Sequence, residues 1–130
     1  MIHSFKVATT LAAYRCVSAL SGTAFSVGYP ERANHFLLGI TKDTVKDTTN
    51  SIPVAGPGER ALLYFNDTVT SGQLVKSDTS GRGVPFTIAA DTTTSLTITS
   101  AYIGVLLGPT VALTGTIAEV YIAPGLAKGT

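Results

Sequence analysis

Residues 60–66 (RALLYFN) and 115–122 (GTIAEVYI) place apolar side chains at every second position, so that one face of each segment is apolar, as in half-buried β-strands. Both segments are built largely of β-branched, aromatic and aliphatic residues. Residues 94–99 (TSLTIT) show the same period of two. Glu119 and Tyr121 are expected to face outward. The residues expected on the inner face are Ala61, Leu63 and Phe65 in the first segment and Ala118, Val120 and Ile122 in the second.

Shorter apolar runs separated by turn residues continue this pattern along the chain. They fall at residues 5–9, 14–19, 36–40, 74–76, 84–88 and 102–106. Gly and Pro clusters at residues 28–30, 56–58, 78–81, 108–109 and 124–125 predict turns or chain breaks between them. Short strands with turns at this spacing indicate a sandwich or barrel. The sequence therefore predicts an all-β fold, a small single-domain β-barrel, β-tulip or sandwich, with at most one short helix at residues 31–38.

The domain organisation is expected to be simple. Residues 1–10 are predicted to form an N-terminal arm or edge strand, and residues 11–130 one β domain. Residues 41–51 (TKDTVKDTTNS) are polar and are expected to form an exposed loop. A weak internal duplication relates residues of about 10–58 to those of about 69–125, in which the segments at 36–40 and 102–105 resemble each other and each half closes with a strand-like piece, at residues 52–58 and 119–125.

The composition disfavours several classes of function. Only 13% of the 130 residues are charged, and the formal net charge is +1. No basic run is present to attract nucleic acid or an anionic membrane, and no apolar stretch is long enough for a membrane helix. The polar surface is expected to consist mostly of hydroxyl groups, since 20 Thr and 10 Ser are present. Such a surface is weakly protected by charge against association and suits a chain that contacts other proteins.

Three blocks in the second half carry a resemblance to a known family. Residues 69–85 (VTSGQLVKSDTSGRGVP), 102–107 (YIGVLL) and 114–122 (TGTIAEVYI) resemble, in order and spacing, the "VTAGQLVKLDASGKVVP", "AIGVALE" and "AGELVEVLL" blocks of bacteriophage capsid decoration (cement) proteins. The first half departs from the family pattern at residues 12–15 and 41–51. Within residues 69–85, Leu74 is expected to face the core and Val75 to face away, or the reverse.

The resemblance implies a structural virion protein. It implies binding to the outer surface of an icosahedral phage head, where the chain cements neighbouring major capsid proteins against internal DNA pressure. The implied partners are the major capsid protein and copies of the chain itself, as a homotrimer at three-fold or quasi-three-fold positions. Assembly would take place in the host cytoplasm. The alternative is a virion- or cell-surface β-sandwich module that binds carbohydrate or acts as an adhesin.

Residues able to support catalysis or metal binding are sparse. His3, His35 and Cys16 could be imagined as a nucleophile with a base, or with Asp43 and Asp47 as metal ligands, but no spacing motif for either site is present. Cys16 is interpreted as a small buried residue. Residues 56–60 (GPGER) lack the ending of a phosphate loop and are interpreted as a turn. The five Tyr are dispersed and are interpreted as core edges or interface positions. We therefore expect no enzyme activity, no cofactor and no metal.

The N-terminal segment supplies the candidate contact residues. Ile2, Phe5 and Val7 are apolar side chains at an otherwise free terminus. A terminal arm of this kind can become ordered on the edge of a neighbour's sheet by β-addition. These three residues are therefore predicted to contact the capsid or another partner.

Overall fold

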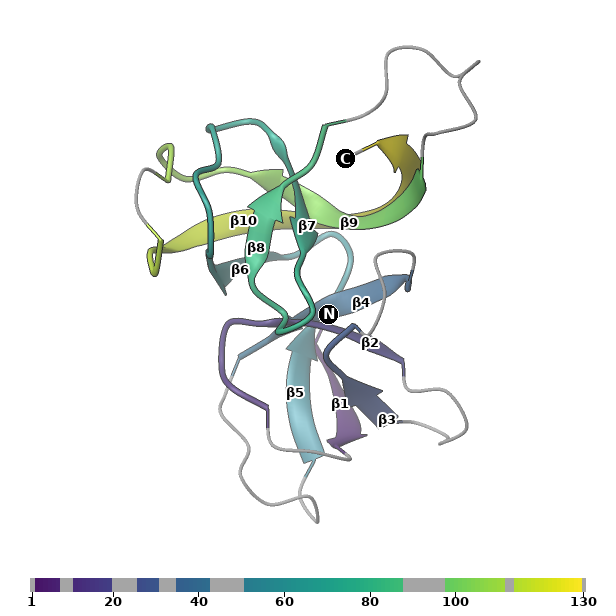
Figure 1. Ribbon diagram of the computed structural model, residues 1–130. Coiled ribbons are helices and arrows are strands. Elements are labelled where there is room, and N and C mark those ends of the chain that lie inside the picture. Colours follow the sequence, from purple (N-terminus) through teal and green to yellow (C-terminus); the bar gives the residue numbers. More distant parts are fainter. Residues whose placement is uncertain are drawn as a thin grey trace.

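The computed structural model of the chain describes residues 2–7, 11–19, 26–30, 35–42, 51–87, 98–111 and 114–129. The described residues form an all-β fold of ten strands arranged in two sheets, with no helix among them (Figure 1). The strands are β1 (Ile2–Val7), β2 (Cys16–Ala19), β3 (Ser26–Gly28), β4 (Leu37–Thr41), β5 (Ser51–Ala55), β6 (Arg60–Tyr64), β7 (Leu74–Ser77), β8 (Gly83–Pro85), β9 (Ile98–Leu106) and β10 (Ile117–Gly129).

The first five strands close into a barrel in the order β1-β3-β2-β4-β5. β1 pairs antiparallel with β5 from Ile2 to Lys6 and parallel with β3 at Lys6 and Val7. The N-terminal segment is therefore part of the barrel wall and has neighbours on both sides, which differs from the predicted free arm or edge strand. Pairing on both sides satisfies backbone groups that an arm would leave to water.

The last five strands form a second sheet in the order β6-β10-β9-β7-β8. A parallel bridge between Phe65 and Gly83 brings the two outer strands toward each other, and the amide of Asn66 donates to the carbonyl of Gly83 at 2.9 Å. The second sheet is therefore curled, and β6 and β8 meet only at this point among the described residues.

The second sheet repeats the strand order and strand directions of the barrel. The barrel is a closed ring in which β5 returns to β1. Raising every strand number by five gives the ring β6-β8-β7-β9-β10, which is the order of the second sheet read in the opposite direction. The Phe65–Gly83 bridge takes the place of the parallel β1–β3 pair. Val17 lies opposite Gly39 and Val75 lies opposite Gly104, and both ladders shift register directly after these pairs. An internal duplication of the chain would produce this repeated arrangement. The duplication itself stays a prediction.

The predicted alternation along β6 and β10 is confirmed. Ala61, Leu63 and Phe65 are buried, whereas Leu62 is 45% exposed. In β10 the inner residues Ala118, Val120 and Ile122 are buried as predicted, and Val75 rather than Leu74 is the buried residue of β7.

Two local predictions are wrong. Leu37 and Leu38 begin β4, which pairs with both β2 and β5, so the strand predicted at residues 36–40 is confirmed and the overlapping short helix at residues 31–38 is wrong for these two residues; residues 31–34 lie outside the described part. Pro124 and Gly125, predicted to end a strand, lie inside β10, where the register shifts between Ile122 and Gly125. A bulge absorbs the break that these residues would otherwise cause.

The hydrophobic core continues from one sheet to the other. One buried cluster contains Cys16 and Ile40 of the barrel together with Leu63 and Ile103 of the second sheet. A smaller cluster fills the barrel around Val17, Ile52 and neighbours. Backbone hydrogen bonds also cross between the sheets, from the amide of Cys16 to the carbonyl of Gly81 at 2.7 Å and from the amide of Tyr64 to the carbonyl of Tyr14 at 2.9 Å.

Some predicted segments cannot be compared with the structure. Residues 43–50 of the expected loop, residues 94–97 of the third alternating segment, and Asp43 and Asp47 lie outside the described residues. Of the strands described, β3 and most of the length of β10 beyond residue 122 were not expected.

Candidate interaction surface

An apolar patch lies on the outer face of the second sheet. Leu62 of β6, Ile117 of β10 and Leu107 just after β9 are exposed by 44–48% and line one hollow of about 450 Å³. Tyr121, 41% exposed, follows Ile117 and Glu119 on the same face of β10. We call Leu62, Leu107, Ile117 and Tyr121 the apolar patch. Clustered exposed apolar side chains of this size are typical of surfaces that contact another protein.

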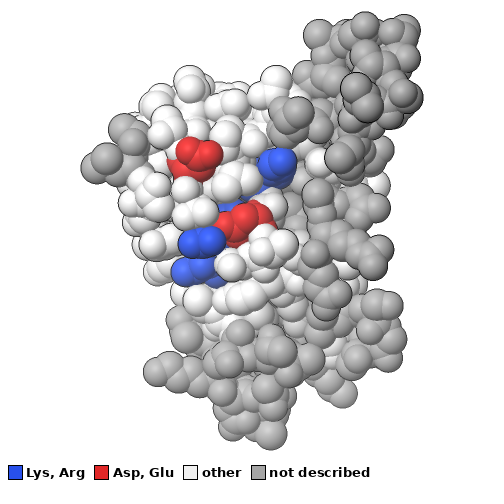
Figure 2. All heavy atoms as spheres, in the orientation of Figure 1, with Lys and Arg blue, Asp and Glu red and all other residues white. Residues whose placement is uncertain are grey.

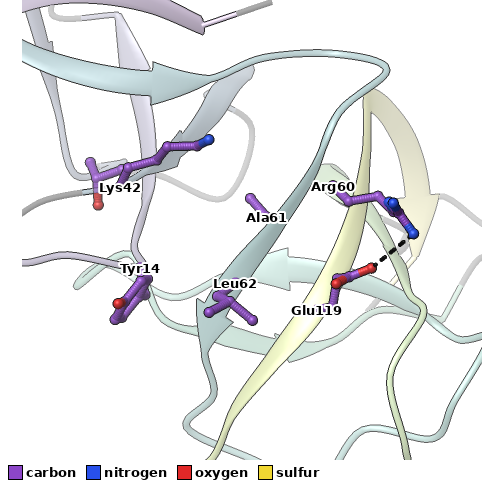
Figure 3. Close-up of a pocket in the computed structure, with 7 residues that line it drawn as sticks. Tyr14, Lys42, Arg60, Ala61, Leu62 and Glu119 are labelled. Atoms are coloured by element: carbon purple, nitrogen blue, oxygen red, sulfur yellow. Dashed lines mark ion pairs between the residues drawn. The ribbon is translucent and has the colours of Figure 1, made fainter.

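A second hollow, of about 280 Å³, lies where the barrel meets the second sheet. The end of β4 and the segment before β2 contribute Lys42 and Tyr14, and β6 contributes Leu62 (Figure 3). Leu62 and Glu119 line both hollows, so the two hollows are neighbours and these two residues lie between them. We call the 280 Å³ hollow the junction hollow.

Charges at the junction hollow are few. Arg60 and Glu119 form an ion pair of 3.6 Å between Nη1 and Oε1, with side chains 70% and 43% exposed. Exposed pairs of this length contribute little stability because water and salt screen them. Lys42 is exposed and makes no ion pair within the described ranges. The hollow therefore combines the apolar side chains of Ala61 and Leu62 with one ion pair, Arg60–Glu119, and one further cation, Lys42.

Tyr14 fixes the geometry of the junction. Its φ of 62° is the left-handed conformation, which is costly for a bulky residue. The surrounding hydrogen bonds hold it there: its amide donates to the carbonyl of Thr41 at 2.9 Å, and the Thr41 hydroxyl donates to the carbonyl of Ala12 at 2.8 Å. The next residue, Arg15, places its guanidinium 4.5 Å from the centre of the Tyr64 ring.

Charged side chains on the face seen in Figure 2 gather near its middle, and the rest of the described surface there is uncharged. Asp78 and Arg82 form a 2.8 Å ion pair in the β7–β8 turn. Asp78 also accepts hydrogen bonds from the amides of Ser80 and Arg82, both at 2.9 Å. Asp78 thus caps this turn, as an aspartate side chain in a turn commonly does.

Cys16 lies in the core, as predicted. It is fully buried, and burial raises the pKa of its thiol to about 12, with a hydrogen bond to Ser77 opposing the rise and Asp78 adding to it. His35 is not among the groups that shift this pKa. A neutral buried thiol is a poor nucleophile. No group of three or more potential metal ligands is found among the described residues.

Residues 56–60 form a turn that leads into β6, as predicted. Gly58 has a φ of 85°, and its amide donates to the carbonyl of Ile122 at 2.8 Å. No helix that is long and apolar enough to cross a membrane is found among the described residues.

The predicted contact residues Ile2, Phe5 and Val7 all lie in β1. Of their side chains, the structure describes that of Phe5, which is partly buried against the barrel cluster. Phe5 thus contributes to the packing of the barrel. Contact of these three residues with a partner stays a prediction.

Sequence reasoning missed the apolar patch as a site. The period of two placed Leu62 and Tyr121 on the outer face, but it gave no reason to single them out. The meeting of Leu107 with Ile117 depends on the β9–β10 pairing, which joins residues distant in sequence. Tyr14, Tyr64 and Tyr121 lie on or near this surface, whereas Tyr102 packs against the ring of Phe86 at 5.8 Å.

Comparison with known proteins gives a fold likeness. No family model and no curated protein matches the chain. Among solved structures, the chain is similar to the N base of the head fiber protein gp8.5 of bacteriophage phi29, with a TM-score of 0.66 and 12% sequence identity. The likeness covers 95% of this chain and 93% of the other. The two chains share a fold over nearly their whole length.

Proposed function

We propose that this chain is a structural protein of a bacteriophage virion that binds the outer surface of the head. The observation that carries the proposal is the likeness to the base of a phage head fiber over 95% of this chain. The sequence blocks at residues 69–85, 102–107 and 114–122 also resemble those of phage capsid decoration proteins. Two comparisons of different kind thus lead to proteins of the phage head, and the role is proposed to be non-catalytic.

The finer proposal is that the chain cements neighbouring major capsid proteins, as a homotrimer at three-fold or quasi-three-fold positions. The apolar patch supports it, because Leu107 and Ile117 expose 48% and 44% of their area with no described neighbour covering them. Each contact can be weak, since many symmetric copies bind one particle and their affinities combine.

The test is co-sedimentation of the purified chain with empty shells of the major capsid protein from the same genome. We expect the wild type to sediment with the shells and to raise the temperature at which they rupture. The double substitution Leu107→Asp and Ile117→Asp should weaken binding by about tenfold or more, because charged groups would have to be buried.

The matched control is Thr79→Asp with Thr87→Asp, which adds the same charge at exposed positions outside the patch. The control should bind like the wild type. Absence of wild-type binding would contradict the proposed function, and equal binding by both double variants would show that the patch is not the contact surface.

A further inference from the structure

In the part of the chain that the structure describes, β6 has an open edge beside the junction hollow. In an antiparallel ladder, alternate residues direct their N–H and C=O groups toward the same neighbour. Glu59 and Phe65 bond to β10, through Ile122 N–H to Glu59 C=O at 2.8 Å and Phe65 N–H to Thr116 C=O at 2.9 Å. The amide of Tyr64 points the other way, to Tyr14. Leu62, an even number of residues from Tyr64, therefore directs its N–H and C=O away from β10.

Neither β8 nor the segment before β2, the two described segments on the side of β6 away from β10, covers its edge at Leu62. β8 reaches β6 only at the Phe65–Gly83 bridge. The segment before β2 pairs at Tyr64 and then turns away, because Tyr14 is in the left-handed conformation and the preceding residues are held by Thr41. No hydrogen bond to Leu62 from outside the β6–β10 ladder is found in the described part of the chain.

The junction hollow runs along this edge. Its described lining includes Ala61 and Leu62 on the strand and Tyr14, Thr41 and Lys42 facing them. In Figure 3 the Lys42 side chain extends toward β6, and Arg60 pairs with Glu119 beside the strand. An extended peptide placed here would meet the N–H and C=O of Leu62, apolar surface and the Lys42 ammonium group. Outside the β6–β10 ladder, none of these polar groups has a partner within the described ranges.

We propose that this edge accepts an extended, acidic peptide segment of the shell protein as an added β-strand. The proposal rests on the proposed function for the source of the segment. Backbone bonds to Leu62 would fix its register, the apolar lining would take one of its aliphatic side chains, and Lys42 would pair with a carboxylate. Charge complementarity selects an acidic rather than a basic segment, since Glu119 is already engaged by Arg60.

The first experiment uses synthetic peptides and needs no capsid. Acetyl-TVEVEVT-amide and acetyl-TVKVKVT-amide are titrated into the labelled chain while the backbone amides are followed by NMR. We expect the acidic peptide to shift the amides of Arg60 and Leu62 and to slow hydrogen exchange at Leu62. The basic peptide should bind more weakly.

Two substitutions separate the backbone and charge contributions. Leu62→Pro removes the outward N–H without removing a ladder bond, as proline is tolerated at strand edges, and it should weaken peptide binding by more than about tenfold. Lys42→Glu should weaken it by about fivefold. Leu62→Val keeps the amide, and Lys76→Glu makes the same charge change on β7; both should bind nearly as the wild type does.

The second experiment repeats the hydrogen exchange on shell-bound chain. Protection of Leu62 on shells, lost in Leu62→Pro, supports the proposal. Shell binding by Leu62→Pro equal to that of Leu62→Val overturns it while leaving the proposed function intact. Failure of the acidic peptide to affect Arg60 and Leu62 also overturns it, whether or not the shells bind the chain.

Discussion

Cys16 shows how the core determines the chemistry of a single residue. Its amide donates to the carbonyl of Gly81 in the β7–β8 turn, and its side chain belongs to the cluster shared by both sheets. A thiolate there would lose its hydration without gaining a compensating charge, so the thiol stays protonated. The residue serves as a small apolar side chain at the junction of the two sheets.

This burial predicts a pH dependence of stability. In the unfolded chain Cys16 ionises near its ordinary pKa of 9.0, whereas in the folded chain it stays protonated up to a pKa of about 12. Above pH 9 the unfolded state therefore binds fewer protons, and stability is lost as pH rises, by at most about 1.4 kcal/mol for each pH unit. Urea unfolding of the wild type and of Cys16→Ala, from pH 8 to 10.5, measures this.

The readout is the difference in stability between the two proteins, because every ionisable group other than the Cys16 thiol is common to both. The wild type should lose stability relative to Cys16→Ala above pH 9. Parallel curves would mean that the thiol ionises as readily in the folded chain as in the unfolded one.

At the scale of elements, period-two patterns predicted the strands that have one buried and one exposed face. Arg60–Tyr64 and the start of β10 follow this pattern, and both were identified with their faces. Ser26–Gly28 is buried throughout and only three residues long, so it has no alternation to detect. Pro124 and Gly125 have the local chemistry of a turn, but the long pairing of β10 with β9 prevails and a bulge forms.

The candidate site was less predictable than the strands. The outward direction of Leu62 follows from its neighbours in sequence, but the open edge beside it depends on where β8 ends and on the conformation of Tyr14. These are properties of pairing between distant segments. Local sequence carries no signal for them, because the same residues could equally lie beside a covering strand.

Gly39 of β4 and Gly104 of β9 occupy corresponding positions in the two sheets and provide a test at this scale. A Cβ on Gly104 would fall on the carbonyl oxygen of Tyr121, and one on Gly39 would fall on that of Ala55. Each glycine and the carbonyl that it faces lie in adjacent paired strands, so a methyl group would require the backbone to shift within a hydrogen-bonded ladder. Gly104→Ala is therefore expected to destabilise the fold by about 1–3 kcal/mol, measured as a lower urea midpoint.

The control is Gly108→Ala, whose added Cβ would have its nearest contact at 3.4 Å, to the amide nitrogen of Glu119. It should unfold close to the wild-type midpoint. If Gly104→Ala were as stable as this control, β9 and β10 would not approach each other as closely at Gly104 as the structure shows.

For the whole molecule, two sheets of the same strand order share one core and present different surfaces. The barrel brings Tyr14 and Lys42 to the junction, and the second sheet brings the apolar patch and the β6 edge. Only 13% of the residues are charged, and 20 Thr and 10 Ser supply hydroxyl groups. This arrangement suits a protein that holds neighbours together through many small contacts.

The most direct measurement is a difference map by electron cryomicroscopy between shells with and without the added chain. Extra density on the outer surface, at three-fold or quasi-three-fold positions and fitted by the barrel and curled sheet, is the predicted result. Saturating amounts of chain that leave the outer surface unchanged would contradict a structural role on the phage head.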